Sequence, residues 1–330
     1  TTEIYTLSLH DALPIYLKKQ AFATVLGIVL MLFVAGMDYH IWQRLAVFGY
    51  LAAVALSVAV MLFGREINGS KRWLALGPFS FQPSEFAKVA LILFLADLVT
   101  KNVKTIGKMW TLCRIMFWIL PIVGLVGASN LSTAIIILGI GVILIFVASP
   151  KYAQFALMGL AGACFMGIFL ALESYRLERL AIWRNPEKYE KGYQTLQGLY
   201  AIGSGGVFGV GLGNSVQKLG FVPEAQNDMI FSIICEELGL AGAGIIVFLF
   251  LLLIWRFFMI ASGSRDLFGA LIATGAMAHM MIQVVLNIAV VTNTIPNTGI
   301  TLPFISYGGT SVMFLLIEMG LVLSVSQVVD

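Results

Sequence analysis

The chain has 330 residues, of which 59% are hydrophobic and 11% are charged, and its mean hydropathy is +0.94. Soluble domains carry roughly 25% charged residues, so this composition excludes a soluble protein and indicates one that is embedded in lipid. The net charge of +3 is spread over the loops, which excludes a nucleic-acid-binding surface. The three cysteines lie in or beside apolar runs without a C-x-x-C pair, which argues against a disulfide framework or a zinc site.

The first stretch, "TTEIYTLSLHDALPI" (residues 1–15), differs in character from everything that follows it. It has no initial methionine and no apolar run, and it resembles translated sequencing-adapter sequence. We interpret it as a non-native segment and leave it out of the fold prediction. We expect residues 16–330 to form a single membrane domain.

Apolar runs long enough to span a bilayer, which takes about 20 residues per helix, follow one another along the chain. We therefore predict an all-α polytopic membrane protein. Among the short loops, Lys and Arg are more frequent near residue 40, at 101–112, near 150 and near 260, which predicts that these loops are cytoplasmic. The long segment 174–228 carries six Lys and Arg residues on the opposite side, but long loops obey this rule less strictly. The nine predicted spans are residues 22–38, 44–63, 84–100, 113–127, 131–149, 152–173, 229–254, 268–291 and 302–326.

The stretch "INGSKRWLALGPFSFQPSEFAKV" (residues 67–89) breaks this pattern with a turn at Asn-Gly and a helix start at Pro83. Glu85 and Lys88 then lie one helical turn apart on the same face. One interpretation is an ion pair at the membrane interface. The other is that Lys88, with Arg72 nearby, binds an anionic headgroup such as a phosphate, while Glu85 orients the lysine.

Residues 174–228 are too polar and glycine-rich to cross a membrane, and we expect them to lie along its outer surface as short amphipathic helices and turns. Their run "GSGGVFGVGLG" contains no G-x-G-x-x-G, which excludes a dinucleotide-binding loop. Two interpretations of these glycines remain open. They permit close backbone turns against the helix bundle, or they let backbone amides approach a sugar or a phosphate.

The stretch "FVPEAQNDMIFSIICEELG" (residues 221–239) places Asp228 directly before an apolar helix that is predicted to begin near Met229. Capping of that helix by Asn227 or Asp228 would account for the aspartate. It would not account for Glu236 and Glu237, which lie two turns inside the helix, where carboxylates are costly. We therefore interpret this acidic end as a candidate site.

Polar residues also interrupt the last two spans. His279 and Gln283 are one turn apart and form either an interhelical hydrogen-bond pair or part of a proton relay, while Glu318 has no partner that the sequence identifies. The stretch "PNTGITLPFISYGGTS" contains two prolines and adjacent glycines, which break or kink the final helix. It serves either as a structural kink or as the wall of a lipid groove.

Three strings, "NGSKRWLALGPFSFQPSEFAK", "GYQTLQGLYAIGSGGVFGVGLGNSVQKLGFVPEAQNDMIFSIICEELGL" and "NTGITLPFISYGGTS", resemble the signatures of the SEDS family (shape, elongation, division and sporulation). The resemblance runs from about residue 16 to the C-terminus. It implies ten spanning helices, of which this chain would have nine, and a multi-pass protein of the bacterial cytoplasmic membrane. It also implies a polymerase that joins lipid II, the lipid-linked peptidoglycan precursor, to the nascent glycan strand on the outer face, in complex with a class B penicillin-binding protein.

The same resemblance assigns roles to individual residues. The essential aspartate of the family falls on Asp228, and its substrate-binding residues fall on Arg72, Glu85 and Lys88. "SNLST" at 129–133 stands where the family often has "PDLGT", so Asn130 replaces a common aspartate. Met229 replaces the usual Phe, which changes packing rather than chemistry.

Polymerisation by a single inverting displacement needs one base for the acceptor hydroxyl and cations for the leaving pyrophosphate. We assign Asp228 as the general base and Arg72 and Lys88 to the pyrophosphate. Alternatively, Asp228 holds a divalent cation, Mg or Mn, against the pyrophosphate. Two other functions remain open, a transporter that flips lipid II across the membrane and a noncatalytic scaffold for a transpeptidase.

Overall fold

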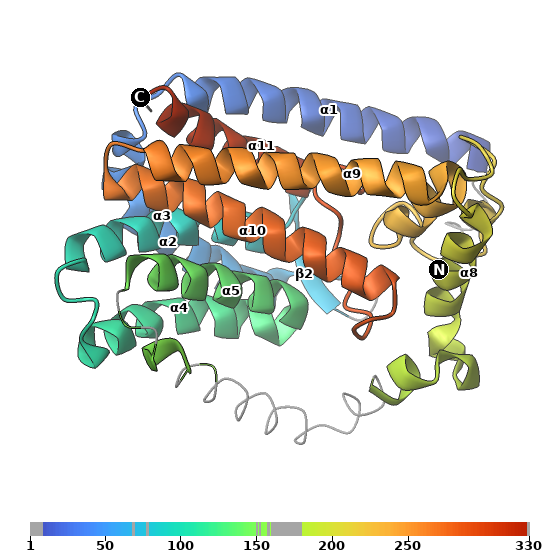
Figure 1. Ribbon diagram of the computed structural model, residues 1–330, viewed down its shortest axis with the longest axis horizontal. Helices are drawn as coiled ribbons and strands as arrows, with labels where there is room; N and C mark the ends of the chain where they lie inside the picture. Colours follow the sequence, from blue (N-terminus) through green and yellow to red (C-terminus); the bar gives the residue numbers. More distant parts are fainter. Residues whose placement is uncertain are drawn as a thin grey trace.

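A computed structural model describes residues 9–67, 70–76, 79–149, 151, 153–156, 159 and 180–328. Long helices lie side by side in a bundle, and seven of the described helices are long and apolar enough to cross a membrane (Figure 1). The predicted span 152–173 falls mostly outside the described residues, so the count of nine stays a prediction. The seven are α1 (Leu9–Ala35, apolar from Leu17), α2 (His40–Phe63), α4 (Met109–Ser129), α5 (Leu131–Ala148), α9 (Ile230–Gly263), α10 (Leu267–Val291) and α11 (Gly309–Ser326).

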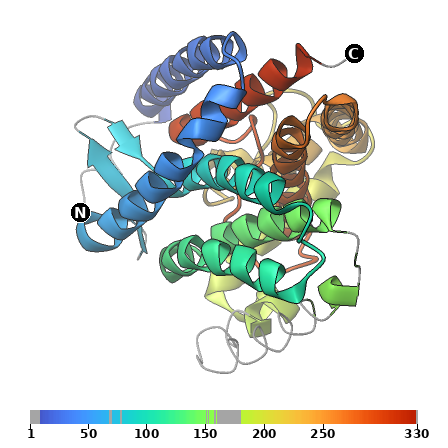
Figure 2. The same cartoon turned by 90° about the vertical axis from the view of Figure 1, so that its left-hand side faces the viewer.

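Helix α3 (Pro83–Asn102) is the central helix of the bundle, packed against α2, α5 and α10 (Figure 2). It corresponds to the predicted span 84–100, yet it carries four charged residues. Most of its residues are buried by protein, so its charges are shielded from lipid by neighbouring helices. Charged residues inside a membrane are tolerated in such an interior position, where partners can reach them.

A small antiparallel sheet joins α2 to α3. Its strands are β1 (Arg65–Ile67), β2 (Ser70–Leu76) and β3 (Phe79–Phe81), in the order β1-β2-β3. The all-α prediction describes the bundle but omits this sheet, because strands of three to seven residues leave no clear alternation in the sequence. The sheet carries Arg72 and positions it next to the bundle.

The segment 180–228 gathers at the end of the bundle where α9 begins (Figure 1). As predicted for the long loop 174–228, the described part consists of short helices and turns, while 174–179 lie outside the described residues. The turns between α3 and α4 and between α9 and α10 lie at the opposite end. The short elements are η2 (Pro186–Lys188), η3 (Glu190–Gly192), α8 (Tyr193–Gly205) and η4 (Gln217–Leu219).

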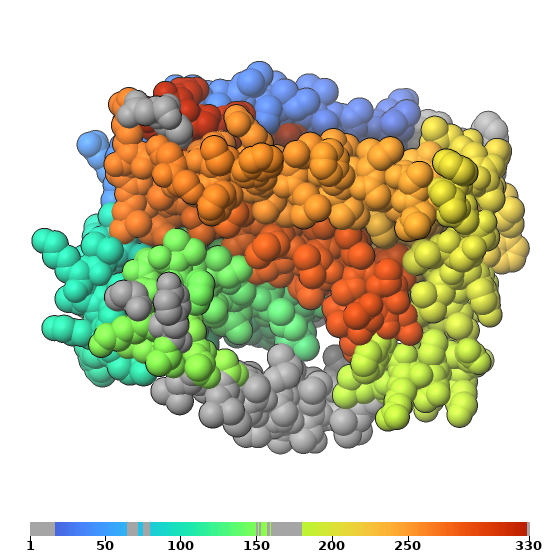
Figure 3. Space-filling model, in the orientation of Figure 1, coloured from blue at the N-terminus to red at the C-terminus, as the bar shows by residue number. Residues whose placement is uncertain are grey.

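The glycine-rich run packs its backbone directly against a break in α9. Gly239 interrupts that helix with a φ of 68°, and the amides of Val210 and Gly211 donate to the carbonyls of residues 236 and 237. A Cβ on Gly209 would come within 2.1 Å of the backbone of residue 237. This contact supports the first interpretation of these glycines, close turns against the bundle. In the space-filling view the loop continues the surface of α9 (Figure 3).

Candidate active site

Asp228 lies in the turn before α9, whose N-cap residue is Met229, and its side chain is 8% exposed. Its Oδ1 accepts a hydrogen bond from Gln194 Nε2 of α8 at 3.3 Å. On its other side it faces Gly299, since a Cβ on that exposed glycine would lie 3.8 Å from Oδ2. The carboxylate therefore lies just below the surface, between α8 and the loop that precedes α11.

Burial raises the pKa of Asp228 to about 6, with a smaller contribution from the charge of Glu224. Hydrogen bonds from the amides of Asp228 and Met229 and from Gln194 act in the opposite direction and favour the ionised carboxylate. The predicted cap by Asn227 or Asp228 is not formed, because Met229 is the N-cap residue of α9 and no side chain caps this helix. A pKa near 6 leaves the group ionised at neutral pH but more basic than a free aspartate, as a general base requires.

A non-helical segment, Asn297–Leu302, runs from Asp228 into the bundle. Side chains of α5 and α10 hold it by donating hydrogen bonds to its backbone carbonyls, which have no partners within a helix. The donors and carbonyls are Ser132 Oγ to Thr298 at 2.8 Å, Asn287 Nδ2 to Ile300 at 2.6 Å, and Gln283 Nε2 to Thr301 at 3.0 Å. Asn287 Nδ2 also donates to the carbonyl of Asp228 at 2.8 Å.

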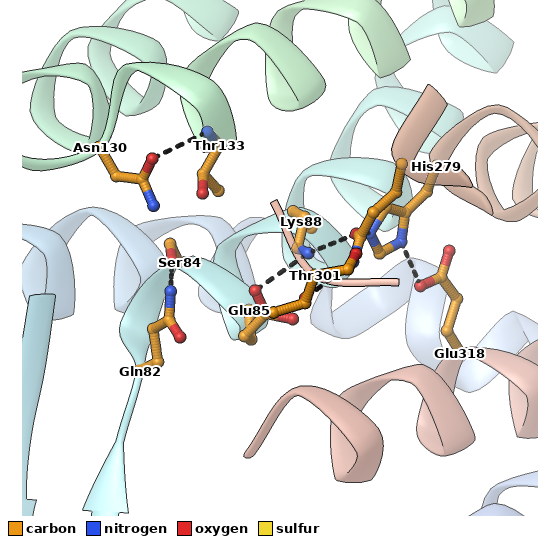
Figure 4. A network of polar contacts seen from close by, with 10 residues as sticks. Gln82, Ser84, Glu85, Lys88, Asn130, Thr133, His279, Thr301 and Glu318 are labelled. Atoms are coloured by element: carbon orange, nitrogen blue, oxygen red, sulfur yellow. Dashed lines mark hydrogen bonds and ion pairs between the residues drawn. The ribbon is translucent and has the colours of Figure 1, made fainter. Parts of the chain in front are cut away.

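Lys88 and Glu85 form the predicted ion pair, with 3.0 Å between Nζ and Oε1, and both side chains are buried. Lys88 Nζ also donates to Gln283 Oε1 at 3.2 Å (Figure 4). Gln283 Oε1 contacts His279 Nε2 at 2.8 Å, and His279 Nδ1 contacts Glu318 Oε2 at 2.7 Å. The partner of Glu318, which the sequence does not identify, is therefore His279. The network also encloses Lys88, which does not face the exterior in this conformation.

Arg72 lies at a different place, on β2, where its Nε donates to the carbonyl of Ser129 at 3.1 Å. It lines a small open pocket, with room for about one water molecule, between α2, α4 and the start of α3. Asn130 lines the same pocket and caps α5, since its Oδ1 accepts from the amide of Thr133 at 3.2 Å. The pocket has polar and apolar walls, formed by Ser57, Val60, Arg72, Pro83, Ser84, Leu125, Val126, Ser129 and Asn130.

The predicted site residues therefore occupy three neighbouring places rather than one cluster. Segment Asn297–Leu302 links them, because Gly299 faces Asp228, Thr301 contacts the Gln283 that binds Lys88, and Thr298 accepts from the first turn of α5, which begins beside Asn130. The sequence does not predict that this segment connects the three places, although its prolines and glycines predict a break in the final helix.

The divalent cation considered at Asp228 stays a prediction. Gln194 presents its amide nitrogen to Oδ1 of the carboxylate, so a cation there would bind through the other oxygen. Among the described residues no group of three or more His, Cys, Asp and Glu side chains could hold a metal ion. Because Mg²⁺ is commonly held by one carboxylate together with waters and substrate phosphates, the general-base and metal-binding roles of Asp228 both stay open.

Glu236 and Glu237 hold the glycine-rich loop, which corrects their interpretation as markers of a site. Glu236 accepts hydrogen bonds from the hydroxyl of Ser215 and from the amide of Val216. Glu237 pairs with Lys218 at 2.6 Å. Buried carboxylates are stable when they receive such bonds, so a structural role accounts for both.

Comparison with known proteins supports the resemblance seen in the sequence. Stage V sporulation protein E of Bacillus subtilis is 39% identical over 94% of this chain and 87% of that protein. A probable peptidoglycan glycosyltransferase FtsW of Trichlorobacter lovleyi is 34% identical over 96% of this chain and 84% of that protein.

Solved structures share the fold. A chain of the structure described as "Structural coordination of polymerization and crosslinking by a peptidoglycan synthase complex" has a TM-score of 0.84 and 30% identity, covering 95% of this chain and 90% of that one. RodA of Thermus thermophilus has a TM-score of 0.71 and 30% identity, covering 95% and 88%. The profile of the FtsW/RodA/SpoVE cell cycle proteins matches residues 3–330, and the chain therefore belongs to this family of multi-pass membrane proteins, as its SEDS signatures predict.

Proposed function

We propose that this chain is a peptidoglycan glycosyltransferase that polymerises lipid II by an inverting displacement, with Asp228 as the general base. The names of the relatives support the reaction class. The observation that carries the proposal is the Asp228 carboxylate. It lies just below the surface, between α8 and the loop that precedes α11, and its pKa is raised to about 6. This base takes the proton of the acceptor sugar hydroxyl while that oxygen attacks the anomeric carbon of the donor and the pyrophosphate-lipid departs.

The leaving pyrophosphate needs a cation, and Arg72 is the better placed of the two predicted ones because it lines the open pocket. A guanidinium binds phosphate oxygens with two parallel hydrogen bonds. Lys88 acts from the enclosed network, where it holds Gln283 and through it the carbonyl of Thr301.

In this proposal the site faces outward from the cytoplasmic membrane. Asp228 directly precedes α9, and this helix begins at the end of the bundle opposite the turns that the Lys and Arg distribution assigns to the cytoplasm (Figure 1). Lipid II reaches it from the bilayer, and the growing glycan strand extends into the space outside. A class B penicillin-binding protein is the proposed partner that cross-links this strand, in keeping with the synthase complex of a structural relative.

The test is polymerisation of labelled lipid II by the detergent-solubilised chain together with its partner. We expect glycan strands from the wild type and none from Asp228→Asn. Wild-type polymerisation that is lost with a chelator shows that Asp228 acts together with a divalent cation. Asp97→Asn is the matched control, because Asp97 is equally buried but lies near the other end of α3. Loss of activity in both variants while both remain folded, or in neither, contradicts the assignment of the base. Activity in detergent, where no bilayer separates two compartments, excludes a flippase or a scaffold as the whole function.

A further inference from the structure

We infer that Gln194 is a positioning residue for Asp228 and that Asn297 fixes the direction in which the Gln194 amide points. The inference rests on the proposed function, since it concerns how the base is kept ionised and aimed. Neither residue belongs to the constellation that the sequence predicts. Both are half-buried and surround the place where the Asp228 carboxylate meets the exterior.

Three consecutive hydrogen bonds form a relay that ends on the carboxylate. The backbone amide of Gly299 donates to Asn297 Oδ1 at 3.1 Å. Asn297 Nδ2 donates to Gln194 Oε1 at 3.1 Å. Gln194 Nε2 then donates to Asp228 Oδ1 at 3.3 Å and to the carbonyl of Pro223 at 3.2 Å.

Both ends of this relay have a fixed polarity. A side-chain amide can be turned by 180° without changing its shape, so its direction follows from its partners. The backbone amide of Gly299 only donates, and the carbonyl of Pro223 only accepts. Between these two groups only one arrangement satisfies every bond, and it points an N–H of Gln194 at Asp228.

The direction of the amide matters for the charge of Asp228. An N–H that points at a carboxylate stabilises its ionised form, whereas an amide oxygen in the same place repels it. The relay therefore opposes the burial that favours the protonated acid. The relay also holds the Asp228 side chain against α8, because its Oδ1 accepts from Gln194.

The test measures lipid II polymerisation by the full chain with its partner between about pH 5 and pH 9, and separates kcat from KM. For the wild type we expect an acid limb with a midpoint near 6. Gln194→Leu and Asn297→Leu each move this midpoint upward by on the order of one pH unit and so lower kcat at pH 7 by about twofold, with KM little changed. Gln194→Glu moves the midpoint further, because it places a second carboxylate beside the first.

Two controls separate the relay from general damage. Gln197→Leu makes the same change one turn along α8 and leaves the Gln194 amide in place, so its acid limb stays at the wild-type position. The double variant Gln194→Leu/Asn297→Leu is no worse than Gln194→Leu alone, because both changes remove the same bond to Asp228.

An acid limb that stays at the wild-type midpoint in folded Gln194 and Asn297 variants overturns the inference, as does an additive effect in the double variant. Should Gln194→Leu fail to fold, Asn297→Leu still tests the relay, because it leaves α8 intact. A wild type that makes no polymer contradicts the proposed function instead, so the two failures are distinguishable.

Discussion

Asp228 is expected to make the protein less stable at neutral pH while it makes it active. Its pKa is raised from 3.8 to about 6 in the folded chain, so the folded state binds the proton more tightly than the unfolded state does. A carboxyl group with a raised pKa stabilises the fold only at low pH, and its contribution is lost as the pH rises from about 4 to about 6. Above that range the protein keeps an ionised group that it has partly removed from water.

The shift sets the size of this cost. About two pKa units correspond to about 3 kcal/mol at pH 7.5, about half of that at pH 5 and close to none below pH 4. The Asp228→Asn variant has the same shape and no charge, and Asn can still accept from Gln194. It is therefore expected to unfold at a higher temperature than the wild type at neutral pH, although it is expected to be inactive.

The assay is thermal unfolding of wild type and Asp228→Asn in detergent across this pH range. The difference in Tm between the two proteins should be largest near pH 7.5 and should fall to almost zero towards pH 4. Asp97→Asn is the contrasting variant, because Asp97 pairs with Lys101 at 2.6 Å and accepts from Gln43 at 3.0 Å. That substitution removes favourable partners and should lower Tm. A stability difference for Asp228→Asn that is zero or independent of pH would refute the reasoning that burial raises this pKa.

Three further predictions concern the other parts of the site. Lys88→Met leaves the Glu85 carboxylate buried without its cation, so stability should fall by about 3–5 kcal/mol and be partly restored in Glu85→Gln/Lys88→Met, as measured by thermal unfolding. Asn287→Leu leaves two backbone carbonyls without their donor at a cost of about 1–3 kcal/mol each, which should lower Tm and reduce polymerisation at every pH. Arg72→Lys keeps the charge but not the planar fork, so KM for lipid II should rise while the acid limb of Asp228 stays in place.

The spanning helices could be predicted from the sequence because each is a single apolar run, and a bilayer allows little other than helices there. Even so, α3 was predictable only as a span and not as the central helix, since burial by neighbours depends on tertiary packing. The last predicted span, 302–326, begins as a helix only at Gly309. The preceding Pro303 and Gly308 account for the delay, in agreement with the break expected from these residues.

The Glu85–Lys88 pair was predictable because a helix brings residues three apart together. The contacts of Asp228 were not, because its partners come from residues 34, 59 and about 70 positions away in the chain. Glu236 illustrates the reverse error. Its interpretation as part of a site rests on the cost of a carboxylate inside a helix, and the amide of Val216 that offsets this cost lies in a loop 20 positions earlier.

The segment Asn297–Leu302 explains why polar side chains of α5 and α10 lie at this depth in an apolar protein. A non-helical backbone cannot satisfy its own carbonyls, and lipid offers no donors, so the surrounding helices must supply them. Asn287 and Gln283 do so, and each then contacts a second group, the carbonyl of Asp228 in one case and Lys88 in the other. Any displacement of the segment must therefore move the base and the buried network together, which ties the geometry of Asp228 to the charge balance inside the bundle.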